Sequence, residues 1–129
     1  MTYTHEYNES YPGPALPIVE IQVSALTKNT NVLLRRALID SGADATMIPM
    51  RDLDEISARR VDRKRVRGVG GISYSVDIYE VSLSIGPFKI PKIYAVADRQ
   101  NGEAILGRDV LNQFTTTLDG LAYMVHVTQ

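Results

Sequence analysis

The chain has 129 residues, with 14 lysines and arginines against 15 aspartates and glutamates and a formal net charge of −1. This length suits a single domain, and a composition of 44% hydrophobic and 22% charged residues excludes wholesale disorder. The near-zero charge gives no overall reason to expect nucleic acid or an anionic membrane as a partner. The absence of cysteine excludes disulfides, thiol nucleophiles and cysteine-based metal sites. The only histidines are His5 and His126, which are far apart in the sequence. We therefore expect neither a metal nor a cofactor.

No apolar run reaches the roughly 18 residues of a membrane-spanning helix. Residues 1–10 lack the basic and apolar regions of a secretory signal peptide, so the expected location is the cytoplasm. Residues 1–17 are polar and end with three prolines within six residues. This pattern predicts a flexible arm or loop ahead of a domain that spans residues 18–129.

Strand patterns follow the arm in chain order. Alternating apolar residues over 18–25 and an apolar run over 32–39 predict two strands, separated by a turn at residues 28–31. Pro49, followed by acidic residues, predicts a short helix that contains Leu53.

The second half of the chain is also rich in strand patterns. The pattern over residues 72–85 changes phase near Ile78-Tyr79, which predicts a β-bulge or a bend between two sheets. Pro91 predicts that the next strand is an edge strand or is broken. Residues 108–114 predict one or two helical turns, and Asp119-Gly120 predicts a two-residue hairpin turn. In all, about seven strands and two short helices indicate a mainly antiparallel β domain of barrel or sandwich type.

One tripeptide carries possible chemistry. Asp40-Ser41-Gly42 places a carboxylate directly after a strongly apolar strand, followed by a small hydroxyl residue and a glycine. The glycine would let the backbone turn sharply or approach a bound molecule. Taken alone, however, the tripeptide indicates an ordinary turn, because these residue types favour turns for local reasons.

Three segments that occur in order change this interpretation: Asp40-Ser41-Gly42-Ala43-Asp44, the glycine-rich segment 68–71, and Ile105-Leu106-Gly107-Arg108-Asp109. Together they resemble the retropepsin family, the retroviral-type aspartic proteases, over most of the chain. The long C-terminal hairpin, residues 115–127, is more similar to bacterial or cellular relatives than to the compact viral enzymes. The resemblance implies a closed or partly open antiparallel β-barrel of acid-protease type with one or two short helices. It also implies an aspartic endopeptidase that acts on polypeptides as a two-fold homodimer.

The chemistry of aspartic proteases explains why the resemblance implies a dimer. One ionised carboxylate takes a proton from the attacking water, while a second, protonated carboxylate donates to the peptide carbonyl oxygen. The two groups share one proton and titrate as a unit. This chain has a single Asp-Ser-Gly and is too short for two lobes, so the second carboxylate must be Asp40 of another copy.

The resemblance assigns further roles residue by residue. Asp40 matches the catalytic aspartate, and Ser41 matches the hydroxyl residue that braces the two active-site loops across the dimer axis. Gly42, Ala43 and Asp44 match positions that contact the substrate.

The C-terminal segment supplies residues that support the active-site loop. Arg108 matches the arginine that pairs with the second aspartate, so we expect an Arg108–Asp44 ion pair in a partly buried site. The alternative is a solvated arginine at the start of a helix. Leu106 and Gly107 match residues that pack beneath the active-site loop.

The segment Gly68-Val69-Gly70-Gly71 resembles the tip of a flap. Gly68 and Gly70 would let the backbone bend toward an extended peptide, and Val69 would close over it. An ordinary mobile hairpin turn is the alternative. The spacing does not fit the phosphate-binding pattern G-x-G-x-x-G, because residue 73 is serine.

A basic segment, Arg59–Arg67, contains six basic residues and one acidic residue, a local charge of +5. The simplest interpretation is a solvent-exposed strand whose arginine stems cover apolar surface. The segment could instead recruit acidic substrates or contact nucleic-acid phosphates, although the scarcity of nearby aromatics argues against a platform for stacking bases. Two other functions therefore stay open. One is a catalytically silent retropepsin-fold module that dimerises and binds peptides, and the other is a nucleic-acid-binding β domain that uses residues 59–67.

Overall fold

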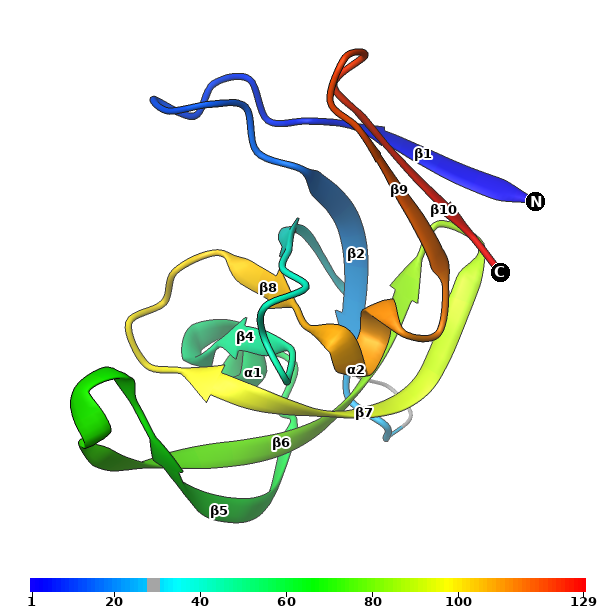
Figure 1. Ribbon diagram of the computed structural model, residues 1–129. Helices are drawn as coiled ribbons and strands as arrows, with labels where there is room; N and C mark the ends of the chain where they lie inside the picture. The colour runs from blue at the N-terminus through cyan, green and yellow to red at the C-terminus, as the bar shows by residue number, and fades with distance from the viewer. Residues whose placement is uncertain (28–30) are drawn as a thin grey trace.

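The computed structural model describes residues 1–27 and 31–129, and most of the turn expected at residues 28–31 lies outside them. The described residues form ten strands, two short α-helices and one 3-10 turn (Figure 1). In chain order these elements are β1 (Thr2–Glu6), β2 (Ile18–Ser24), β3 (Leu33–Ile39), β4 (Met47–Pro49), α1 (Met50–Glu55), β5 (Arg59–Arg67), η1 (Val69–Gly71), β6 (Ser73–Ile85), β7 (Phe88–Asp98), β8 (Ala104–Leu106), α2 (Arg108–Leu111), β9 (Thr115–Asp119) and β10 (Met124–Thr128).

Six of the strands close into a barrel. Their order is β2-β3-β8-β4-β7-β6, and β6 returns to pair with β2. Among the described strands, β5 pairs only with β6, and these two strands extend from the barrel as a long hairpin (Figure 1). The expected β-barrel with two short helices is confirmed. Two of its contacts, β3 with β8 and β4 with β7, are parallel, which the sequence pattern did not reveal.

The barrel interior forms one hydrophobic core. Alternation along β2 points Val19, Ile21 and Val23 inward, where each is at most 1% exposed. Leu53 of α1 and Val110 of α2 are fully buried in the same cluster, so both short helices are held by packing. Each such side chain contributes about 1.5–3 kcal/mol relative to an exposed one. Within the described residues, no helix is long and apolar enough to cross a bilayer.

The two ends of the chain meet in a second, three-stranded sheet of order β1-β10-β9 (Figure 1). The sequence assigned residues 2–6 to an arm, but they form β1 and pair antiparallel with β10. Residues 2–6 can pair regularly because the prolines that prevent pairing begin only at Pro12. Tyr3 of β1 packs against the core, and this burial raises the pKa of its phenol.

The β9–β10 connection is wider than expected. Asp119 pairs with Met124, so the loop comprises residues 120–123, and the two-residue turn expected at Asp119-Gly120 is wrong. The Ala122 N–H donates to Asp119 Oδ1 at 3.1 Å, and Tyr123 has a φ of 55°. The aspartate side chain therefore closes the larger loop in place of a tight turn.

Two bulges shape the long strands. Arg60 pairs with Tyr79 and Asp62 with Ile78, so Val61 is an extra residue in β5. The predicted irregularity near Ile78-Tyr79 therefore exists, but the additional residue belongs to the opposite strand.

Strand β7 accommodates its proline without a break. Pro91 and Lys92 together lie opposite the single residue Ser82 of β6, so the proline sits at a bulge where its missing N–H removes no ladder hydrogen bond. The strand is not broken at Pro91, but the expected edge exists locally: β4 pairs with β7 only from Val96 to Asp98, so among the described residues β6 is the one strand beside Pro91.

Candidate active site

Asp40 lies directly after β3, where this strand pairs in parallel with β8. Its backbone N–H donates to the Leu106 carbonyl at 3.1 Å, which ties the start of the loop to the barrel. The Gly42 N–H donates to Asp40 Oδ1 at 2.9 Å. Asp40 is half-buried, whereas Ser41 and Gly42 are exposed. The carboxylate is thus oriented by its own loop and lies next to an accessible surface.

The loop rests on the junction between β8 and α2. A Cβ atom at Gly107 would lie 2.6 Å from the Ala45 carbonyl carbon and 2.9 Å from the Ala43 carbonyl oxygen. Only glycine therefore fits beneath the loop without moving its backbone. The Arg108 N–H donates to the Ala43 carbonyl at 2.9 Å, and Leu106 is fully buried.

A buried polar network, which the sequence interpretation missed, holds the far end of the loop. Thr46 is fully buried, and its N–H and Oγ1 donate to Asp109 Oδ2 and Oδ1 at 3.1 and 2.8 Å. The Gly107 N–H in turn donates to Thr46 Oγ1 at 3.2 Å, and the Val110 N–H donates to Asp109 Oδ1 at 2.9 Å. An aspartate in the first turn of a helix is a recognisable signal. Its partner, 63 residues away, is not recognisable from local sequence.

The expected ion pair between Arg108 and Asp44 is present. Arg108 Nη2 donates to Asp44 Oδ1, and Nη1 donates to the Ser41 carbonyl at 2.8 Å. The expectation that this pair is partly buried is wrong for the single chain, because the Asp44 side chain is 90% exposed. An exposed pair of this kind contributes at most about 1 kcal/mol.

A groove of about 560 Å³ extends from the loop to the β5–β6 hairpin. It is lined by Ala43, Asp44, Ala45, Met47, Val66, Tyr74, Ser75, Val76, Val96, Ala97, Asp98, Arg99 and Gln100. Of the expected substrate-contacting residues, Ala43 and Asp44 therefore line the groove, whereas Gly42, Gly68 and Gly70 do not. Across residues 1–27 and 31–129, no three histidine, aspartate or glutamate side chains are grouped to hold a metal ion.

The tip of the hairpin is a tight glycine turn. The Gly68 N–H donates to the Ile72 carbonyl at 2.8 Å, and Gly70 and Gly71 have φ values of 83° and 80°. Residues that carry a side chain rarely adopt this backbone conformation, which explains why both positions are glycine. Val69 lies in the same turn, but its side chain is outside the described part of the chain.

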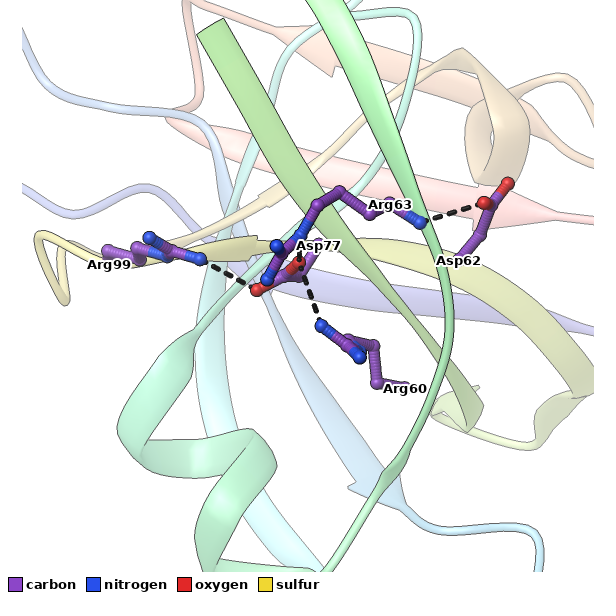
Figure 2. Close-up of polar contacts among 5 residues, drawn as sticks. All are labelled: Arg60, Asp62, Arg63, Asp77 and Arg99. Carbon is purple, nitrogen blue, oxygen red and sulfur yellow. Dashed lines mark hydrogen bonds and ion pairs between the residues drawn. The ribbon is translucent and has the colours of Figure 1, made fainter.

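The basic segment forms β5, whose residues are nearly all exposed. Arg63 Nε and Arg99 Nη2 donate to the two carboxylate oxygens of Asp77 at 2.8 and 2.7 Å, and Arg60 Nη1 lies 3.6 Å away (Figure 2). Hydrogen bonds first from Arg63 and then from Arg99 lower the pKa of Asp77 to about 2, although burial opposes this shift. Part of the positive charge of β5 is thus neutralised within the hairpin.

Known proteins resemble this chain in sequence and in fold. A family model described as "gag-polyprotein putative aspartyl protease" matches residues 26–113. DNA damage-inducible protein 1 of Chaetomium globosum is 30% identical over 88 residues, which cover 65% of this chain and 20% of that protein. The chain thus spans about a fifth of the length of this curated relative.

Two solved structures share the fold. A retropepsin-like aspartic protease from Rickettsia conorii superposes with a TM-score of 0.61 at 13% identity, covering 98% of this chain and 91% of that one. EIAV protease in complex with the inhibitor HBY-793 superposes with a TM-score of 0.56 at 20% identity, covering 80% of this chain and 91% of that one. The family match over more than half of the chain, together with this barrel, leads to one conclusion: the chain belongs to the retropepsin-like aspartic protease family.

Proposed function

We propose that this protein is an aspartic endopeptidase that works as a homodimer, with one Asp40 from each chain. The observation that carries the proposal is the setting of Asp40. Its carboxylate is oriented by the Gly42 N–H on an exposed loop, and the next residues of that loop, Ala43 and Asp44, line the groove. Because the chain has only one such motif, the second carboxylate comes from a two-fold partner.

The two carboxylates would act on either side of one water. The ionised Asp40 removes a proton from the water as its oxygen attacks the peptide carbonyl carbon, and the protonated Asp40 of the second copy donates to the carbonyl oxygen. When the tetrahedral intermediate collapses, the C–N bond breaks and the leaving amine takes a proton from the pair. Two carboxyl groups at close range cannot both be ionised, because their negative charges repel, so the pair keeps one proton between them.

The substrate would lie extended between the groove and the β5–β6 hairpin. The alanines, valines and methionine of the groove favour apolar side chains near the cleaved bond. The glycine turn at the hairpin tip would let the backbone come close to an extended peptide and hydrogen-bond it, and opening of the hairpin would admit the substrate.

The test is cleavage of a peptide library at acidic to neutral pH. Wild type should cleave, and Asp40→Asn should lose about 10²- to 10⁴-fold of the rate. Asp54→Asn is the matched control, because Asp54 is exposed on α1 and should leave the rate unchanged.

Mixing the two chains tests the shared site directly. When equal amounts of wild type and Asp40→Asn are unfolded and refolded together, about a quarter of the random dimers hold two intact aspartates, so activity should be about a quarter of that of wild type refolded alone at the same total chain concentration. A fall to only one half after this joint refolding would show that each chain works alone. If wild type binds peptides without cleaving any, the chain is a silent peptide-binding module instead.

A further inference from the structure

Asp77 of β6 is almost enclosed by arginines from two directions. Its side chain is 8% exposed, and the three guanidinium groups around it belong to Arg60 and Arg63 of β5 and to Arg99 (Figure 2). Arg99 directly follows the last residue of β7. One carboxylate therefore connects both strands of the hairpin with the segment after β7.

The bulge in β5 makes this arrangement possible. Residues of a regular strand alternate between two faces, so Arg60 and Arg63 would point in opposite directions. The extra residue Val61 restores the parity, since Arg60 pairs with Tyr79 while Arg63 pairs with Asp77. Both arginines consequently reach the same face of the hairpin as the carboxylate.

Most hairpin residues that line the groove have the opposite parity, and Ser75 is the exception. Val66, Tyr74 and Val76 line it from β5 and β6, and Arg99 lines it at the far end. The carboxylate of Asp77 thus holds the hairpin wall of the groove against its end. Among the described strands β5 pairs only with β6, so strand pairing alone does not fix β5 to the segment after β7.

We propose that Asp77 is a positioning residue that sets the position of the β5–β6 hairpin relative to the groove and thereby the fit of the bound peptide. This role rests on the proposed peptidase function, because it gives the hairpin a substrate to hold. Without the carboxylate, three like charges face one another at the base of the hairpin and push it away from the segment after β7. The side chains of the three arginines are half-exposed or more, so the barrel core does not depend on them.

The first experiment measures hydrogen exchange without using activity. In Asp77→Asn, amides of residues 59–76 should exchange about tenfold faster, while amides of β9 and β10 keep their wild-type rates. Arg99→Gln should give the same local effect, and it serves if Asp77→Asn does not fold. Arg65→Gln is the matched control, because Arg65 is exposed on the same face of β5 and has no ion pair within the described part of the chain.

The second experiment separates positioning from simple stability through peptide-cleavage kinetics. A loosened hairpin should raise KM about three- to tenfold in Asp77→Asn and Arg99→Gln, with kcat changed less than about twofold. A merely structural role would lower the active fraction, so that kcat would fall with KM unchanged. Arg65→Gln should match wild type in both constants.

Several results would overturn the proposal. Equal acceleration of exchange in β9, β10 and the hairpin would show general destabilisation. An effect of Arg65→Gln as large as that of Arg99→Gln would show that only net charge matters. If wild type cleaves no peptide, the peptidase function fails, yet unchanged exchange in the hairpin of both variants would still refute the role of Asp77 separately.

Discussion

The buried hydroxyl of Thr46 offers a sharp test of how the active-site loop is held. Thr46→Val keeps the shape of the side chain but removes the atom that donates to Asp109 Oδ1 at 2.8 Å and accepts from the Gly107 N–H at 3.2 Å. The Gly107 N–H then stays buried without an acceptor, which costs about 1–3 kcal/mol, and a hydrogen bond to a charged group is also lost. Because the Thr46 N–H still donates to Asp109, we expect a total of about 2–4 kcal/mol rather than the full sum.

The protein offers a matched control for this change. The Oγ1 atom of Thr116 is buried and finds no hydrogen-bond partner among the described residues. Thr116→Val therefore removes a buried hydroxyl that makes no hydrogen bond to the described residues, and its effect on the free energy of unfolding should range from neutral to about 1 kcal/mol of stabilisation.

Thermal and urea unfolding of both variants check the reasoning. At about 4 °C for each kcal/mol, Thr46→Val should lower the Tm by about 8–16 °C, while Thr116→Val should not lower it. Peptide cleavage by Thr46→Val should also fall at temperatures where the protein is still folded, because the loop that carries Asp40 loses its anchor. Equal Tm values for the two variants would refute the proposed role of the network.

Three further predictions follow from the same structure. Gly107→Ala should destabilise by about 1–3 kcal/mol in thermal unfolding, because its Cβ meets backbone atoms, whereas Gly120→Ala, with open space around it, should be near neutral. Arg108→Ala should cost under about 1 kcal/mol in urea unfolding of the monomer, since its partner Asp44 is exposed. A larger loss that depends on protein concentration would indicate that a second copy covers the pair. For Asp77, the folded pKa of about 2 lies below the ordinary value of 3.8, so its contribution is present above about pH 4 and lost as the pH falls toward 2. Urea unfolding across that range should show this extra loss in wild type and not in Asp77→Asn; parallel curves would contradict it.

Local patterns predicted most of the barrel and the position of the candidate catalytic residue. The alternation in β2 follows from burial on one face, and such a signal can be read from a few neighbouring residues. Asp40 could be found because its neighbours in the motif are adjacent in the chain. The same holds for the glycine turn of the hairpin.

The sequence could not predict contacts between segments far apart in the chain. Three features depend on which strands become neighbours: the network between Thr46 and Asp109, the pairing of β1 with β10, and the bulge that turns Arg60 toward Asp77. The Asp119-Gly120 turn failed for a related reason, because the register of β9 on β10 determines the loop length.

The sequence by itself determined the chemistry available to this protein: one aspartate in a motif of the retropepsin-like family, with no cysteine. The tertiary structure decided where that aspartate lies and what holds it. Parallel pairing of β3 with β8 brings the Leu106 carbonyl to the Asp40 N–H. Gly107, the next residue after β8, lets the loop lie directly on the start of α2. Parallel neighbours need a long connection, and here about half of the chain, residues 40–103, lies between these two strands, so no local pattern records the contact.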